Sequence, residues 1–515
     1  MKKLSKLLFS RMVIVGLLIV LQAVILIVAI WKLSEYKIYF QILSILISIL
    51  AILHIINKDE EPGFKVSWCI LILLLPIMGG VLYALFGDNK MSKKFSRKVA
   101  GISNKIDQFF EQNYKQKEEV KKNLLMQDKE MFRQSYYISN ITKMPLHQGT
   151  TSTYFPLGDM MFPSMLENLK KAQHFIFLEF FILHEGVMWN QILEILQEKV
   201  KQGVEVRVMF DDMGCVSTLP NNYQKKLESY GIKCVVFNPF IPILSVMHNN
   251  RDHRKIMVID GYLGYTGGIN LADEYINKIN RFGHWKDSGI LLEGEAVRNL
   301  TLMFLESWNF YRKEDTDFDQ FMPHEYHKEA FPSDGFVQPF GDSPLDFENI
   351  AENVYMNMIN NAKDYLYINT PYLIPDYTLL TSLKNAAKRG VDVRIATPHI
   401  PDKWYVHITT QSYYKSLIKS GVKIYEYTPG FLHAKSMVCD DKVGIIGTIN
   451  LDYRSLYHHF ECGVWLYHTK TIQSMKEDFL STQKICLPVT QEFCNKIPIH
   501  KKIIAELIKI LAPLL

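Results

Sequence analysis

The sequence lacks the marks of a disulfide-stapled, zinc-binding or nucleic-acid-binding protein. Its 515 residues include seven cysteines, an odd number, and no two of them form a C-x-x-C pair. This argues against a disulfide framework and against a cysteine zinc site. Lys and Arg number 58 against 53 Asp and Glu, which leaves a net charge of +5. Such a small, dispersed excess argues against nucleic acid as a partner, but it is compatible with an anionic membrane surface.

Hydrophobic residues make up 48% of the chain, and the excess lies near the N-terminus in three apolar runs at about 12–31, 38–56 and 67–86. The first is long enough to cross a bilayer and too long for a cleaved signal peptide. The third contains Pro76, Gly79 and Gly80, so it is either a kinked span or a re-entrant hairpin. We therefore expect residues 1–89 to form a multi-pass region embedded in the cell membrane.

The orientation of this region follows less directly. Basic clusters precede the first run and follow the third, and the positive-inside rule places both in the cytoplasm. Three complete spans would separate them, so either one run fails to cross or one cluster breaks the rule. We expect a cytoplasmic catalytic region. The polar, charged residues 90–139 are expected to be a juxtamembrane connector, which could touch anionic lipid heads or be an ordinary solvated helix.

The rest of the chain repeats itself. "AQHFIFLEFFI" from Ala172 matches "AKDYLYINTPY" from Ala362, and "QGVEVRVMF" from Gln202 matches "RGVDVRIAT" from Arg389. These short β-branched or aromatic runs are typical of strands, and helical patterns lie between them. Such alternation predicts an α/β fold of two pseudo-symmetric halves, 140–330 and 331–515, each a mostly parallel sheet flanked by helices.

Each half also carries the pattern H-x-K-x-x-x-x-D, as "HRKIMVID" at 253–260 and "HAKSMVCD" at 433–440. The hydrophobic run after each histidine predicts a strand that ends in a turn. Successive side chains of a strand point to opposite faces, and Asp260 is an odd number of residues away from both His253 and Lys255. We therefore expect Asp260 to fix the turn rather than to stand beside them. Both motifs continue to an asparagine, at 270 and 450, with one departure, Thr448 where the first copy has Gly268. The motif residues are His253, Lys255, Asp260 and Asn270, and His433, Lys435, Asp440 and Asn450.

These residue types suit phosphoryl transfer. Histidine supplies a nucleophile or an acid–base group near neutral pH, while lysine and the asparagine amide bind phosphate oxygens. If pseudo-symmetry brings both copies together, one histidine can attack phosphorus while the other protonates the leaving oxygen. No His, Cys, Asp and Glu cluster with the spacing of metal ligands accompanies the motifs, so we expect neither a metal nor another cofactor.

The first half has about ten extra residues just before its motif, within "FIPILSVMHNNRD" at 240–252. This insert is apolar and contains one proline, Pro242. It could be a surface loop that touches lipid or a buried loop that packs on the other half, and the sequence does not favour either.

With these motifs the sequence resembles the phospholipase D superfamily, whose signature is H-x-K-x4-D-x6-G-x2-N in duplicate. It is more narrowly similar to bacterial cardiolipin synthases, through "NNRDHRKIMVIDG", "GGINLADEY", "TPYLIPD", "YEYTPGFLHAKSMVCDD", "IGTINLDYRS" and the terminal "LAPLL". The resemblance covers residues 65–515, and the first hydrophobic run is additional to the family's usual two-span pattern.

The resemblance implies that two phosphatidylglycerol molecules give cardiolipin and glycerol through a phosphatidyl-histidine intermediate. Family analogy makes His253 the nucleophile and His433 the general acid and then the base. It also implies a carboxylate that orients each histidine, and position after each motif assigns this role to Asp287 in "HWKDSG" and Glu461 in "HHFECG".

Two other classes of function compete with this one. The same site could serve hydrolysis, in a phospholipase or a membrane-anchored nuclease, or the chain could be an inactive membrane scaffold. Intact duplicate motifs argue against the scaffold, and the missing basic stripe argues against the nuclease. A transferase must prefer a lipid hydroxyl to water, so it needs a dry, membrane-facing pocket.

Overall fold

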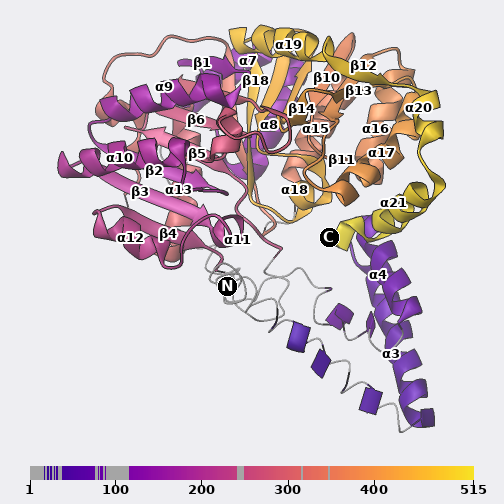
Figure 1. Cartoon of the computed structure of the whole chain (residues 1–515). Coiled ribbons are helices and arrows are strands. Elements are labelled where there is room, and N and C mark those ends of the chain that lie inside the picture. Colours follow the sequence, from indigo (N-terminus) through magenta and orange to yellow (C-terminus); the bar gives the residue numbers. More distant parts are fainter. Residues whose placement is uncertain are drawn as a thin grey trace.

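Two β-sheets, with helices outside and between them, make up the body of the protein (Figure 1). The computed structural model describes residues 37–75, 115–239, 249–314, 317–345 and 348–514, with a few separate residues between 17 and 87. Most of the first hydrophobic run, part of the third and residues 240–248 of the insert lie outside this described part, so the expectations for them are not addressed.

The first half builds a seven-stranded sheet in the order β1-β8-β6-β5-β2-β3-β4. Its strands are β1 (Thr150–Phe155), β2 (Phe175–Phe180), β3 (Glu205–Asp211), β4 (Lys233–Phe237), β5 (Lys255–Ile259), β6 (Leu263–Gly267) and β8 (Gly289–Gly294). The runs of the sequence repeat that begin at Ala172 and Gln202 form β2 and β3, as their β-branched and aromatic composition predicts.

The second half builds an eight-stranded sheet in the order β19-β13-β12-β10-β15-β16-β18-β9. Its strands are β9 (Phe336–Asp342), β10 (Tyr365–Asn369), β12 (Asp392–Pro398), β13 (Lys423–Tyr427), β15 (Ser436–Cys439), β16 (Val443–Gly447), β18 (Glu461–Tyr467) and β19 (Cys486–Val489). Apart from the added β19, this order reproduces that of the first sheet strand for strand, so the two halves are a structural duplication.

The sheets are mixed, which corrects the expectation of mostly parallel sheets. Only β2-β3-β4 and the matching β10-β12-β13 pair in parallel. The motif strand pairs antiparallel with β2 in the first half and with β10 in the second. The remaining neighbours are also antiparallel. The motif strand and the strand after it are joined by a tight hairpin, which makes them antiparallel, whereas parallel neighbours need a helical crossover.

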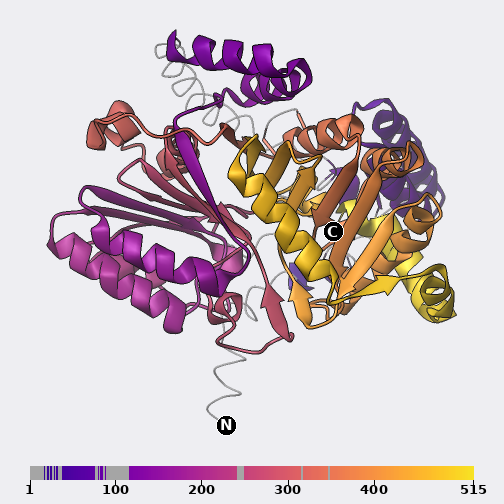
Figure 2. The ribbon, with the colours of Figure 1, turned by 90° about the horizontal axis from the view of Figure 1, so that it is seen from above.

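Helices cover the outer face of each sheet, and two helices lie between the sheets (Figure 2). The outer helices are α9 (Gly158–Lys171), α10 (Val187–Lys201) and α12 (Tyr223–Ser229) in the first half, and α15 (Ile350–Asn361), α16 (Tyr377–Lys388) and α17 (Trp404–Ile418) in the second. The helices α13 (Val297–Tyr311) and α19 (Lys470–Gln483) each contact strands of both sheets.

The core between the sheets is shared by both halves. Phe177 stacks on Phe304 of α13, and Tyr367 of the second sheet stacks on Phe479 of α19, with ring centroids 4.6 and 4.9 Å apart. All four side chains belong to one continuous buried cluster. The halves are therefore fused by a common hydrophobic core rather than joined by a linker.

Short elements complete the described fold. They are α11 (Asp212–Cys215), η2 (Asp273–Ile276), β7 (His284–Lys286), η3 (Asp319–Phe321), α14 (Pro323–Tyr326), β11 (Leu373–Ile374), β14 (Gly430–Leu432), β17 (Leu451–Asp452), α18 (Tyr453–Tyr457), α20 (Gln491–Lys496), α21 (Ile499–Leu511) and η4 (Ala512–Leu514). Of these, β7 pairs with β14 and β11 pairs with β17 as two-stranded sheets.

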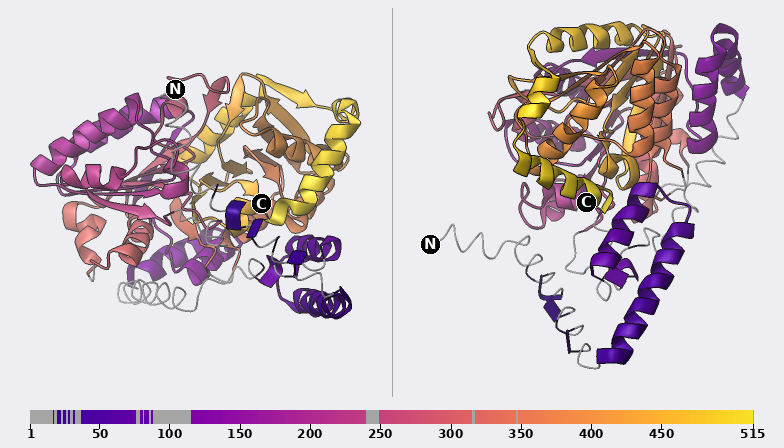
Figure 3. Two further views of the ribbon diagram at one scale, coloured as in Figure 1. Left: turned by 60° about the horizontal axis from the view of Figure 1, so that its bottom comes forward. Right: turned by 90° about the vertical axis from the view of Figure 1, so that its right-hand side faces the viewer.

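The N-terminal helices project from the body next to α21 (Figure 3). They are α3 (Lys37–Asn57), which contains the second hydrophobic run, and α4 (Pro62–Leu74), which Ser67 ties to the backbone of Ile510. Two further helices, α7 (Lys115–Gln127) and α8 (Lys129–Thr142), precede the first sheet. Among the described residues no helix combines the length and the apolarity needed to cross a membrane.

Candidate active site

The two motifs form equivalent hairpins. The first runs through β5 and β6, with Ile259 opposite Leu263, and the second through β15 and β16, with Cys439 opposite Val443. Asp260 follows β5 with a positive φ, and its carboxylate accepts from the backbone N–H groups of 173–175 at 2.8–2.9 Å. Asp440 accepts from those of 363–365 in the same way.

These two aspartates therefore stand apart from the motif histidines. Asp260 and His253 flank a five-residue strand, so their backbones are separated by a distance of roughly 16 Å or more. Each aspartate anchors its hairpin to the start of the central strand β2 or β10. That position agrees with a turn-fixing role and does not bring the carboxylate to the histidines.

The segment before each histidine pairs with the other half of the molecule. The N–H of His253 donates to Phe460 O at 2.9 Å, and the N–H of Phe460 donates to Arg251 O at 2.8 Å. In the second half, β14 runs parallel to β7, and the N–H of His433 donates to Lys286 O at 2.6 Å. Each histidine thus lies beside the chain that leads into the other half's carboxylate.

The carboxylates are consequently exchanged between the halves. His253 Nδ1 lies 2.9 and 3.0 Å from the two oxygens of Glu461, and His433 Nδ1 lies 2.6 Å from Asp287 Oδ2. Both carboxylates are completely buried, and both histidines are nearly so. The sequence indicates these four residues, but it does not show that each pair joins residues from different halves.

The hydrogen bonds define the state of each imidazole. A carboxylate can only accept, so the Nδ1 atom of each histidine carries the proton and Nε2 keeps its lone pair. Burial lowers the pKa of His253 to about 3 and that of His433 to about 4, against the opposing pull of the carboxylates. The paired histidines lower the pKa values of Glu461 and Asp287 despite burial. Both pairs are therefore neutral imidazole beside carboxylate at neutral pH.

The motif lysines are buried beneath the histidines. Lys255 Nζ donates to His253 O, and Lys435 Nζ donates to His433 O. Burial lowers the pKa of Lys255 to about 8 and that of Lys435 to about 7. The charge of Lys255 also helps to lower the pKa values of His433 and Lys435, so the two motifs form one electrostatic cluster.

The two motif copies differ where the first has Gly268 and the second has Thr448, and both residues lie against the buried carboxylates. Thr448 Oγ1 donates to Glu461 Oε2, and Ser455 Oγ donates to Glu461 Oε1 at 2.7 Å. A Cβ at the matching Gly268 would overlap Asp287 Oδ1. Glycine in one copy therefore makes room for one carboxylate, and threonine in the other copy holds the other.

The motif asparagines are hydrogen-bonded within their own halves. Asn270 accepts from the N–H of Ile182 at 3.0 Å and donates to Tyr275 Oη at 2.8 Å. Asn450 donates to Ser455 Oγ at 3.0 Å, the same hydroxyl that supports Glu461. Each amide nitrogen has a second hydrogen beyond these contacts.

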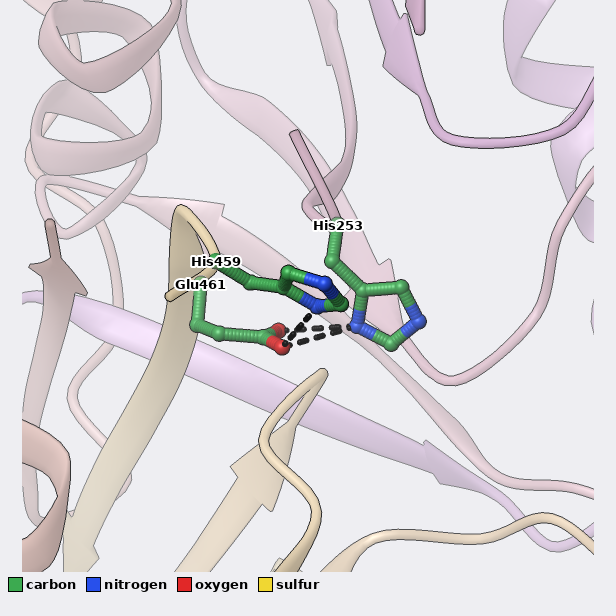
Figure 4. A group of neighbouring side chains, drawn as sticks. All are labelled: His253, His459 and Glu461. Carbon is green, nitrogen blue, oxygen red and sulfur yellow. Dashed lines mark hydrogen bonds and ion pairs between the residues drawn. The ribbon is translucent and has the colours of Figure 1, made fainter. Parts of the chain in front are cut away.

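Sequence reasoning missed a third histidine at the site. His459 lies beside Glu461, and its ring centroid is 5.5 Å from that of His253 (Figure 4). The stretch "HHFECG" contained it, but a lone histidine carries no signal without the fold. Among the described residues, His253, His459 and Glu461 form one group whose ligand atoms lie within 4.8 Å of one another, so they could hold a metal ion.

Comparisons with known proteins agree with this architecture. A family model described as "Cardiolipin synthase, PLD-like domain" matches residues 165–281 and 355–482, and one described as "Phospholipase_D-nuclease N-terminal" matches residues 46–87. The crystal structure of phosphatidylserine synthase from Haemophilus influenzae Rd KW20 has a similar fold, with a TM-score of 0.52 at 12% identity over 74% of this chain and 98% of that one.

Similar sequences extend over almost the whole chain. An uncharacterized protein of Streptococcus mutans serotype c is 43% identical, over 90% of this chain and 99% of its own length. Cardiolipin synthase of Geobacillus sp. (strain WCH70) is 34% identical, over 92% of this chain and 94% of its own. Cardiolipin synthase 2 of Bacillus cereus is 34% identical, over 89% and 88%. The chain therefore belongs to the cardiolipin synthase family of phospholipase D-like proteins.

Proposed function

We propose that this protein is a cardiolipin synthase, which transfers a phosphatidyl group from one phosphatidylglycerol to another and releases glycerol. The observation that carries the proposal is the pair of buried histidines, each with Nδ1 on a carboxylate and with no hydrogen bond to Nε2 from the described residues. Relatives at 33–34% identity that are named cardiolipin synthase support the choice of lipid.

In the first step Nε2 of His253 attacks phosphorus and forms an N–P bond. The bond from phosphorus to the glycerol head-group oxygen breaks. His433 must enter this step as an imidazolium, after it takes up a second proton on Nε2 when the anionic phosphate binds beside it, and it gives that proton to the oxygen, so glycerol leaves. In the second step His433 takes the proton from a hydroxyl of the second phosphatidylglycerol. That oxygen attacks phosphorus, the N–P bond breaks, and cardiolipin forms while His253 returns to its neutral state.

The assignment of the two histidines rests on their different carboxylates. Glu461 also accepts hydroxyl hydrogen bonds from Thr448 and Ser455, which share its negative charge. Asp287 holds His433 at the shorter distance of 2.6 Å and accepts in addition from the N–H of Ser288. Asp287 is thus better suited to stabilise an imidazolium, which favours His433 as the acid and His253 as the nucleophile.

Lys255, Lys435, Asn270 and Asn450 are proposed to hold the phosphate. Each lysine donates one hydrogen to a backbone carbonyl and keeps two more, and each asparagine keeps one N–H. Cations and neutral donors fixed around the phosphate would stabilise the charge that develops on its non-bridging oxygens. Asp260 and Asp440 would support this set by fixing the hairpins that carry it.

The substrate also implies a location. Phosphatidylglycerol resides in membranes, so we propose that the protein acts at the cell membrane, where its N-terminal hydrophobic segments embed it and the catalytic body lies on the cytoplasmic side. We also propose that the membrane region ends near residue 89, the connector near residue 139 and the first phospholipase D-like half near residue 330. No nucleic-acid partner and no catalytic metal are required.

The decisive experiment incubates the full-length protein with vesicles that contain phosphatidylglycerol as the only lipid. Cardiolipin and glycerol in equal amounts are the expected products. Phosphatidic acid and glycerol without cardiolipin would identify a phospholipase D-type hydrolase instead. Acid quenching with labelled phosphatidylglycerol should place the label on His253, and label on His433 alone would reverse the two roles.

A further inference from the structure

His459 is an unexplained imidazole in the middle of the site. Its side chain is only 10% exposed, and within the described part of the chain neither ring nitrogen has a hydrogen-bond partner. The nearest acceptor is Glu461 Oε1, 3.7 Å from His459 Nδ1, which is beyond hydrogen-bond distance. Burial of a polar group without a partner is unfavourable, so a ligand that completes these two nitrogens would stabilise the ring in its place.

The surroundings of His459 offer the right ligand set. Two imidazoles and one carboxylate are characteristic ligands of zinc and related divalent ions. Two ligands of a tetrahedral zinc ion stand about 3.3 Å apart, because each lies about 2.0 Å from the metal. The separations from Glu461 Oε1 are 2.9 Å to His253 Nδ1 and 3.7 Å to His459 Nδ1, on either side of that value. Both rings turn a nitrogen toward the carboxylate (Figure 4).

Glu461 can accept a metal without losing its support. Ser455 donates to Oε1 and Thr448 donates to Oε2, so these hydroxyls fix the carboxylate and leave one lone pair on each oxygen. A metal ion would take the place of the proton that His253 Nδ1 now shares with the carboxylate.

Among the described residues, the other half of the site has no equivalent group. The residue two positions before Asp287 is Trp285, where His459 stands two positions before Glu461. The Trp285 ring lies 5.4 Å from that of His433, so it occupies the matching place, but an indole cannot ligate a metal. The metal site would therefore act on one histidine of the pair only.

We propose that His253, His459 and Glu461 bind a divalent transition-metal ion such as Zn²⁺, and that its binding switches the enzyme off. The metal takes the Nδ1 lone pair of neutral His253, and the single ring proton then resides on Nε2. The lone pair that attacks phosphorus is no longer available. The inhibition rests on the proposed function, whereas metal binding itself does not.

The test begins with binding to the full-length protein in detergent, stripped of metal with a chelator. Titration with ZnCl₂ followed by calorimetry should show one site in the wild type. His459→Asn, which keeps a polar side chain of similar size, should weaken zinc binding by about 100-fold. Exposed His324→Ala is the matched control and should bind as the wild type does. Co²⁺ should give the absorption bands of a tetrahedral site in the wild type and the control only.

Activity gives the second readout. The stripped wild type should form cardiolipin, one equivalent of zinc should stop it, and chelator should restore it, while His459→Asn should stay active at that zinc concentration. Equal zinc binding by wild type and His459→Asn, or no binding by either, would overturn the site. Binding through His459 without inhibition, or activity that appears only with zinc, would overturn the switch. If no cardiolipin forms but zinc still binds through His459, the proposed function fails and the metal site stands.

Discussion

His253 and His433 each place Nδ1 on a carboxylate, and in the proposed mechanism each is needed once in every half-reaction. Replacement of either by alanine should lower kcat by about 1,000-fold or more, because the nucleophile and the acid act as a unit. The measurement is cardiolipin formation by each purified variant. The exposed His324→Ala should retain wild-type activity. Substantial turnover by either motif variant would mean that the two histidines do not share one site.

The lysines should control the alkaline side of the pH profile. Burial lowers the pKa of Lys435 to about 7 and that of Lys255 to about 8, so their charge is lost as the pH rises through that range. We expect kcat/KM to fall between about pH 7 and 8, since it reports the free enzyme. Lys435→Arg, whose guanidinium stays charged, should shift the decline to higher pH.

An alkaline limb that stays in place in this variant would contradict that account. If the decline of kcat/KM keeps its pH in Lys435→Arg but moves to higher pH in Lys255→Arg, the decline belongs to Lys255 alone.

At this scale the sequence and its family resemblance predicted the motif residues and the two orienting carboxylates, Asp287 and Glu461, but not which carboxylate holds which histidine. His253, Lys255, His433 and Lys435 could be predicted because the same sparse spacing occurs twice. The pairing of His253 with Glu461 joins residues 208 positions apart, and it depends on how two finished halves dock. His459 became visible only when β18 was placed beside the first motif.

At the scale of elements, the hairpin that ends at Gly268 is shaped by the carboxylate behind it. A methyl group there would overlap Asp287 Oδ1, so Gly268→Ala should push Asp287 away from His433. A displacement of this kind can cost about 100-fold in rate. We expect kcat of this variant to fall far more than its stability, as measured by phosphatidylglycerol turnover and thermal unfolding.

Gly341→Ala in β9 is the matched control, because its Cβ would meet the flexible side chain of Met303 at 3.2 Å and would approach the backbone oxygen of Glu461 only to 3.8 Å, an ordinary contact distance. Equal activity of the two variants would show that Asp287 does not need its present position.

The strands themselves were predictable, while their direction was only partly so. Alternating strands and helices correctly indicated the parallel sets β2-β3-β4 and β10-β12-β13. The hairpin turns at Asp260 and Asp440 already required antiparallel neighbours, and β8 and β18 return in the same way. The expectation of mostly parallel sheets gave too little weight to these turns.

At the scale of the whole molecule, the shared core should make both halves unfold together. Phe304 is fully buried and stacks on Phe177 and Trp308 in the cluster that also contains the second sheet. Phe304→Ala should cost about 3–5 kcal/mol. It should shift a single unfolding transition rather than split it, as followed by calorimetry in detergent. Exposed Ile279→Ala should have little effect, and two separate transitions in the variant would show that the halves are independent.

Acid should destabilise the folded protein through the same histidines. Their pKa values are lowered in the folded state from 6.5 to about 3 and about 4, so between these limits the unfolded chain binds more protons. Stability should therefore fall as the pH drops from about 6.5 toward 4. The double variant His253→Gln/His433→Gln should flatten this slope in melting temperatures measured across the range. An unchanged slope would assign the acid sensitivity to other groups.

The exchange of carboxylates between the halves has a consequence for biosynthesis. A ribosome makes His253 long before it makes Glu461, and domains generally fold from the N-terminus first. During that interval the first half carries an imidazole with no carboxylate to hold its proton on Nδ1, and the acid His433 does not yet exist. Under the proposed mechanism the nascent chain is therefore inert until Glu461 has been made and has docked beside His253. A product that ends before Glu461 lacks the carboxylate that holds His253, so under the proposed mechanism it would not turn over lipid.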